Sequence, residues 1–78
     1  MKNIIKFILR KNGHIISNDK NQIIFMLCTK YYYIVRKINN KYIITKNKKD
    51  KNNYIVISPE IKRDTQKEII FFLKAVRN

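Results

Sequence analysis

Short apolar runs separated by polar clusters make up most of this chain. The segments 14–17, 22–28 and 54–57 are rich in isoleucine, valine or phenylalanine, and most of their ends adjoin Gly, Asn or Ser. Apolar runs this short and this β-branched favour strands over helices. The segments 31–38 and 41–45 have the same β-prone character. The pattern therefore predicts four or five strands.

The connections between these runs are polar. Asn18–Asn21 is predicted to form the tip of a first hairpin, and the wholly polar residues 46–53 are predicted to form a surface loop. Asn39-Asn40 tolerates positive φ and can form a two-residue hairpin loop. Such a loop would place Val35 opposite Ile44 in the core.

In that same register Arg36 would face Ile43 and project outward. Alternation along the strands also requires at least one of Tyr32 and Tyr33 to face inward. The sequence therefore predicts which side chains of this hairpin enter the core.

The two ends of the chain are ambiguous. Residues 4–9 are apolar apart from Lys6, and Gly13 could end a short helix or allow a bend. Near the other end, one set of residues recurs every three to four positions, as on one face of a helix: Ile61, Thr65, Ile69, Phe72, Leu73 and Val76. The continuous block 69–73 would equally suit a strand that closes a barrel. Both interpretations stay open at the level of sequence.

A single domain over residues 1–78 is expected, because a chain this short is near the lower limit for an independent core. The predicted fold is all-β: a small five-stranded OB-type barrel, because closure removes exposed strand edges. The alternative is an α-β-β-β-α sandwich, with helices at 2–12 and 60–77 flanking a three-stranded sheet. That alternative would suit a double-stranded RNA-binding or toxin-like module, and a phage-encoded interaction protein is a third possibility.

Charge indicates the class of partner. The chain has 18 basic and 5 acidic residues, a formal net charge of +13. Isoleucine, lysine and asparagine, which have AT-rich codons, supply about half of the residues, so part of the lysine content reflects a GC-poor genome. The excess still favours nucleic acid, with an anionic membrane surface as the second option. No apolar run approaches the ~18 residues that a membrane span needs.

Few residues can support catalysis or metal binding. Cys28 is the only cysteine, which excludes a disulfide framework and a multi-thiolate zinc site within the chain and favours a small buried hydrophobe. His14 is the only histidine, and it has no paired carboxylate. We therefore expect no enzymatic activity, no cofactor, no metal and no small-molecule substrate.

Three clusters are candidate RNA contacts. The first-hairpin tip offers hydroxyl, amide and ammonium groups, the second hairpin offers a basic rim, and the polar run that follows has the densest charge. Their alternatives are an ordinary turn, a solvated rim and a solvated loop. The tyrosines could stack on bases, although strand packing is the more common role. In chain order, the candidates are Ser17, Asn18, Lys20, Arg36, Lys37, Lys41, Lys46, Lys48 and Lys49.

The residues of these clusters also resemble a known family. Gly13-His14-Ile15-Ile16-Ser17-Asn18, then Lys20 and Ile23-Ile24-Phe25, are similar to the first hairpin of bacterial and organellar small-subunit ribosomal protein seventeen. Arg36-Lys37 with Lys41-Tyr42 resembles its basic strand pair. Residues 54–76 resemble its closing strands. The chain departs from the family in a shorter first tip, in a missing Lys-His-Pro segment and in Ile69, which replaces a tryptophan.

The resemblance implies an OB-fold constituent of the small ribosomal subunit that acts in translation. Its partners would be small-subunit ribosomal RNA and neighbouring ribosomal proteins. Lys62, Arg63 and Lys67 would fall within the family's basic terminal signature. The protein would lie in the ribosome of an organelle with a GC-poor genome, such as a plastid or apicoplast, or of a GC-poor bacterial cytoplasm.

Overall fold

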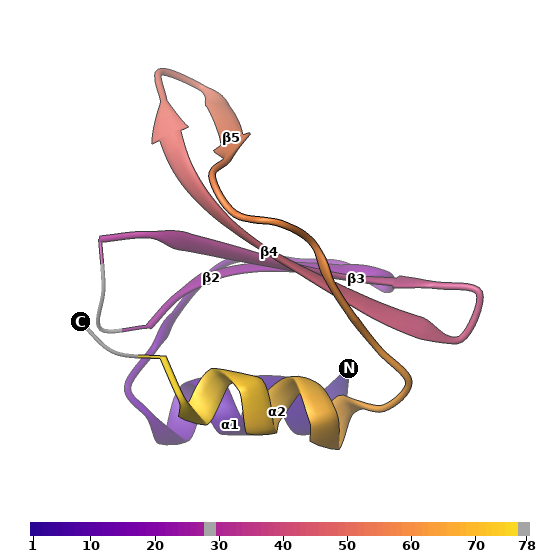
Figure 1. Ribbon diagram of the computed structural model, residues 1–78. Helices are drawn as coiled ribbons and strands as arrows, with labels where there is room; N and C mark the ends of the chain where they lie inside the picture. Colours follow the sequence, from indigo (N-terminus) through magenta and orange to yellow (C-terminus); the bar gives the residue numbers. More distant parts are fainter. Residues whose placement is uncertain (28–29, 77–78) are drawn as a thin grey trace.

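One antiparallel sheet with two short helices on one of its faces makes up the structure (Figure 1). The computed structural model describes residues 1–27 and 30–76. The prediction of a mostly β chain is confirmed. In chain order the elements are α1 (Lys2–Arg10), β1 (His14–Asn18), β2 (Gln22–Met26), β3 (Tyr32–Ile38), β4 (Lys41–Asp50), β5 (Asn53–Val56), β6 (Ile61–Arg63) and α2 (Gln66–Lys74).

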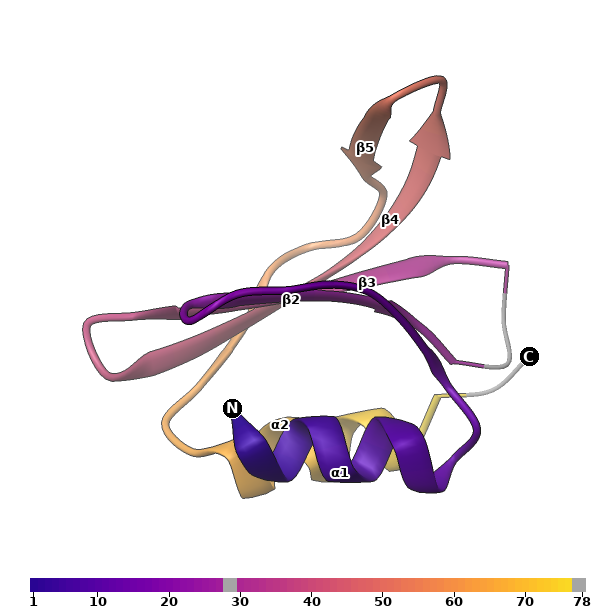
Figure 2. The ribbon, with the colours of Figure 1, turned by 180° about the vertical axis from the view of Figure 1, so that it is seen from behind.

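The sheet does not close into a barrel. Its strand order is β1-β2-β3-β4-β5, and β6 also pairs with β4. The helices α1 and α2 run side by side in the same direction beneath the sheet (Figures 1 and 2). They bury the apolar face that closure would otherwise have to bury. Both chain ends are thus helical, as the alternative proposed, but the sheet has six strands instead of three.

Helix α1 forms because its apolar residues recur on one side. Ile4, Phe7 and Ile8 are buried, whereas Lys2 and Lys6 are exposed. The helix ends at Arg10, and Asn12, just beyond its cap, has a φ of 59°. The Gly13 amide then donates to the Ile8 carbonyl at 2.8 Å, so this glycine follows the end of a helix.

The side chain of Gln66 in α2 caps the start of α1. Its Oε1 atom accepts hydrogen bonds from the amides of Asn3 at 3.0 Å and Ile4 at 3.3 Å. We expect Gln66→Ala to lower the free energy of unfolding by about 1 kcal/mol, because two helix-terminal donors lose their acceptor. Gln66→Glu keeps an acceptor beside the positive end of α1 and should be neutral or stabilising. Urea denaturation of both variants checks this, and equal losses would contradict the capping role.

The terminal segment contains both a strand and a helix. Residues 61–63 form β6, and α2 follows after Thr65, whose hydroxyl accepts from the Glu68 amide at 3.2 Å. Thr65-Gln66-Lys67-Glu68 has the sequence signature of a capping box, which favours a helix and which periodicity alone misses. Ile69 and Leu73 of α2 are buried. Residue 77 of the predicted helix lies outside the described residues.

The hairpin of β3 and β4 has the predicted register. Asn39 and Asn40 have φ values of 51° and 62°, as a two-residue loop of this type requires. Val35 pairs with Ile44, and both are buried. Arg36 pairs with Ile43 on the sheet face opposite the helices, as expected.

The core lies between the sheet and the helices. Phe25 of β2 stacks on Tyr33 of β3, with ring centroids 5.8 Å apart. Tyr33 is thus the inward-facing member of the Tyr32–Tyr33 pair. The buried hydrophobic residues are Ile4, Phe7, Ile8, Ile23, Phe25, Tyr33, Val35, Tyr42, Ile44, Ile69 and Leu73. Cys28, expected to be a buried hydrophobe, lies outside the described residues.

The predicted loop over 46–53 is wrong, because β4 continues to Asp50. Residues 47–50 of β4 pair with residues 53–56 of β5, and this ladder satisfies the backbone of a polar strand. The turn is at Lys51, which has a φ of 58°. We call residues 47–56 the β4–β5 arm. It rises from the sheet on the side away from the helices (Figure 1).

Candidate nucleic-acid interface

A shallow groove separates α1 from the tip of the β1–β2 hairpin. Its volume is about 630 Å³, and we call it the α1 groove. It joins two predicted contact residues, Asn18 and Lys20, to two lysines of α1 that sequence reasoning missed. Its lining residues are Met1, Lys2, Ile5, Lys6, Asn18, Asp19 and Lys20.

Helix geometry brings the α1 lysines to this groove. Lys2, Lys6 and Arg10 are spaced four residues apart, so they form one exposed stripe that advances by about 6 Å per step. Buried Ile4 and Ile8 face the core from the other side of the helix. The absence of an acidic residue from this amphipathic helix was a signal that could have identified the stripe.

Local hydrogen bonds set the shape of the hairpin tip. The Asp19 amide donates to the Gln22 carbonyl, and its Oδ1 accepts from the Asn21 amide, each at 2.9 Å. Lys20 is therefore held exposed at the end of the hairpin, next to exposed Ser17 and Asn18 at the end of β1.

The flank of the molecule formed by α1, β1 and β2 has little negative charge. Residues 1–27 contain five lysines and arginines, and Asp19 is their only acidic residue. The Asp19 carboxylate already accepts a hydrogen bond within the tip. The α1 groove therefore has a positive potential that attracts anions.

Two of the predicted contacts are instead paired with carboxylates. Arg36 lies 3.6 Å from Glu60, and the Lys41 ammonium bonds to Asp64. The hydrogen bond to Asp64 raises the pKa of Lys41 above its ordinary value of 10.5. This pair is therefore intact at neutral pH, and it is lost as the pH rises through that raised pKa. Both cations are partly neutralised where they stand.

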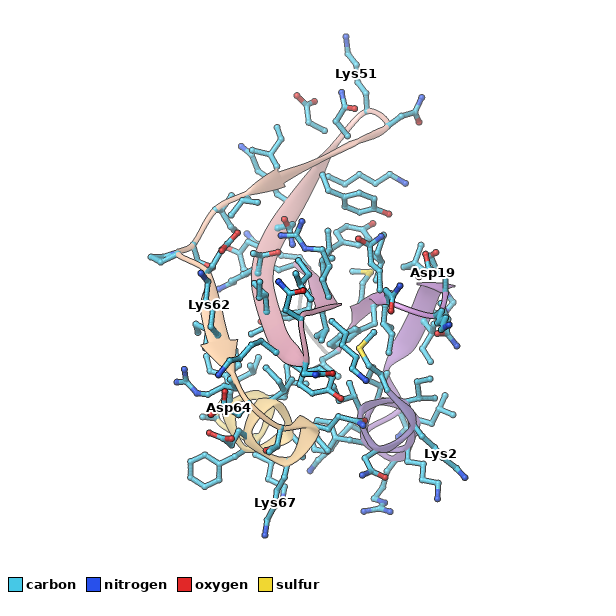
Figure 3. All side chains as sticks on the ribbon, turned by 90° about the vertical axis from the view of Figure 1, so that its right-hand side faces the viewer. Lys2, Asp19, Lys51, Lys62, Asp64 and Lys67 are labelled. Atoms are coloured by element: carbon cyan, nitrogen blue, oxygen red, sulfur yellow. The ribbon has the colours of Figure 1, made fainter. Side chains whose placement is uncertain are left out.

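The basic residues near the carboxyl end lie on the opposite flank. Figure 3 shows Lys2 and Asp19 on one side of the molecule and Lys62, Asp64 and Lys67 on the other. Lys62 and Arg63 belong to β6, and Lys67 is in the first turn of α2. Glu60, Asp64 and Glu68 lie within the same segment, so its charges are mixed.

The remaining predicted lysines do not form one cluster. Lys48 and Lys49 are exposed on the β4–β5 arm, whose turn carries Lys51 at its end (Figure 3). Lys46 is half-buried, with its Nζ 4.1 Å from the Tyr31 ring centroid. It lines a cavity of about 450 Å³ between the sheet and the end of α2, together with Tyr33, Ile61 and Phe72.

Most tyrosines of the chain pack within the protein. Tyr33 and Tyr42 are buried, and the rings of Tyr32 and Tyr54 meet edge to face with centroids 5.3 Å apart. The Lys37 ammonium lies 5.9 Å from the Tyr42 ring centroid, where the electron-rich face of the ring attracts its charge. Base stacking on any tyrosine stays a prediction.

The described residues form neither a metal-binding cluster nor a membrane-spanning helix. Over 1–27 and 30–76, no group of three or more His, Cys, Asp or Glu side chains could hold a metal ion. Within the same ranges, no helix has the length and apolar character of a membrane span. Comparison with known protein-family models, curated proteins and solved structures finds no match to this chain.

Proposed function

We infer that this protein binds RNA through the sugar-phosphate backbone and has no catalytic role. The observation that carries this inference is the α1 groove, where Lys2 and Lys6 of α1 meet Lys20 of the β1–β2 turn beside one hydrogen-bonded carboxylate. Lysine ammonium groups act as point charges that attract phosphate without reading base edges. Asn18 adds an amide that can bond to phosphate or to the 2′-hydroxyl.

The RNA indicated by the sequence is that of the small ribosomal subunit. This part of the proposal rests on the resemblance over residues 13–76 and on the net charge of +13. It does not rest on the fold, because the sheet is open. The protein would then be a structural constituent of the subunit, in an organelle or bacterium with a GC-poor genome.

Binding of the purified chain to an RNA duplex tests the first part. We expect the logarithm of the affinity to fall linearly with the logarithm of the salt concentration. Three to five phosphate contacts give a slope of about −3 to −5, because each releases condensed counterions. Fluorescence anisotropy across a salt series measures the slope. A flat dependence, or stronger binding to anionic lipid vesicles than to RNA, would contradict the proposal.

Sedimentation tests the ribosomal part separately. The tagged chain should co-sediment with small ribosomal subunits at moderate salt and dissociate at high salt. If the chain binds RNA but does not co-sediment, the ribosomal part of the proposal is wrong and the RNA-binding part stands.

A further inference from the structure

β5 and Ile57, which directly follows it, carry aliphatic side chains that stay partly exposed. Ile55, Val56 and Ile57 are 39%, 53% and 42% exposed. Successive strand residues point to opposite sides, so both faces of the β4–β5 arm carry exposed aliphatic groups. Two-stranded ribbons are marginally stable in water, and this one projects from the sheet on the side away from the helices (Figures 1 and 2).

The free edge of β5 also presents unpaired backbone groups. The Ile57 amide donates to the Lys46 carbonyl at 2.9 Å, which fixes the alternation of the ladder. Ile55 and Asn53 therefore point their backbone groups at β4, and Tyr54 and Val56 point theirs away from it. These outward amides and carbonyls match the hydrogen-bonding groups of an added strand.

The other strand edges of the described sheet are protected. β1 has a bulge between Ile15 and Ser17, and β6 carries Lys62 and Arg63. Bulges and charges of this kind prevent a further strand from pairing. The edge strand Asn53–Val56 has no charge and no proline, and it pairs with β4 without a register shift.

Charge selects the occupant of this edge. The neighbouring stretch of β4 and its turn contain Lys46, Lys48, Lys49 and Lys51 against a single carboxylate, Asp50. An added strand lies about 10 Å from β4, a separation close to the screening length of ~8 to ~10 Å at ~0.15 to ~0.1 M salt. A second copy would bring the same lysines and be repelled. Aliphatic side chains at a strand edge also suit a peptide better than RNA, because bases stack on aromatic rings.

We propose that the edge of β5 accepts, by strand addition, an extended acidic and aliphatic segment of a partner protein. The segment's backbone pairs with that of Tyr54 and Val56. Its aliphatic residues pack on Ile55, Val56 and Ile57, and its carboxylates lie near the lysines of β4. This mode of recognition takes affinity from main-chain bonds and specificity from alternate side chains.

A short peptide of alternating glutamate and valine is the probe, titrated into the full chain labelled with ¹⁵N. We expect the Tyr54 and Val56 amides to exchange at least about tenfold more slowly when the peptide is bound. The same peptide methylated on every second backbone nitrogen should bind at least about tenfold more weakly, because it cannot complete the ladder. Equal affinity of the two peptides would overturn the proposal.

Variants locate the contact. Val56→Pro removes an outward amide and no ladder bond, and Val56→Lys places a charge on the edge. Each should weaken peptide binding at least about tenfold, whereas Phe71→Lys, an equal charge change on exposed α2, should leave it unchanged. If the proline variant fails to fold, the lysine variant decides. In the absence of peptide, an RNA oligonucleotide or self-association of the chain could also slow hydrogen exchange of the Tyr54 and Val56 amides. Either result would assign the edge to that occupant and overturn the proposal.

Discussion

Replacing Lys2, Lys6 and Lys20 together by glutamate is expected to lower the affinity for an RNA duplex by at least about 100-fold at ~0.1 M salt. Each change removes a cation from the α1 groove and adds an anion that repels phosphate. The salt dependence should become shallower by about three, one for each lost phosphate contact. Fluorescence anisotropy at several salt concentrations measures both quantities.

The helix should tolerate these changes. A carboxylate at position 2 lies in the first turn of α1, where the helix dipole favours negative charge. A carboxylate at position 6 precedes Arg10 by four residues, which is a stabilising order of charges. Loss of binding would therefore report on the interface, and circular dichroism of the variant checks that the fold is intact.

A matched variant on the opposite flank serves as the control. Lys62, Lys67 and Lys74 of β6 and α2 can be replaced by glutamate with the same change in net charge. These residues stand among Asp64 and Glu68, so their loss should weaken binding by less than about fivefold. Equal losses from the two triple variants would mean that net charge, not the groove, determines binding. A larger loss of affinity in the control would mean that RNA binds at β6 and α2, the segment that resembles the family's basic terminal signature.

Phe25→Ala is expected to lower the free energy of unfolding by about 3–5 kcal/mol. Phe25 is fully buried, and its ring stacks on Tyr33 between the sheet and the helices. Truncation would leave a cavity that the neighbouring side chains fill only in part. Domains of this size have a total stability of about 5–15 kcal/mol, so the midpoint of thermal unfolding should fall by at least about 12 °C.

Phe71→Ala makes the same chemical change at an open position. The Phe71 side chain is 78% exposed on α2, so the variant should stay within about 0.5 kcal/mol of the parent. Thermal unfolding followed by circular dichroism compares the two. A similar loss from both variants would mean that the core does not lie where the sheet meets the helices.

The local features of the fold could be predicted from the sequence. Asn39-Asn40 supplies two residues that adopt positive φ, and this chemistry sets the register that pairs Val35 with Ile44. Ile4, Phe7 and Ile8 recur with the period of a helix. Thr65 and Glu68 are residues typical of a helix N-terminal cap. Such signals act over a few residues, so they can be read without the rest of the molecule.

The extent of β4 could not be predicted in the same way. Residues 46–50 are polar, and hydrophobic alternation, the usual signal of a strand, is absent from them. Pairing with β5 keeps this segment extended, because the ladder satisfies its backbone groups. The open sheet likewise depends on α1 and α2, whose packing covers the face that a barrel would have enclosed.

The sequence by itself determined the approximate positions of β1 to β5, the tight turn and the strongly cationic character of the protein, and it left helix and strand open at both ends. Only the tertiary structure decided which cations meet. Lys2 and Lys6 join Lys20 because the Gly13 turn returns the chain beside α1, while Asp64 and Glu60 approach Lys41 and Arg36 through pairing at the other edge of the sheet. Charge composition is a property of the chain, but electrostatic potential depends on distances in space, and long-range packing sets those distances.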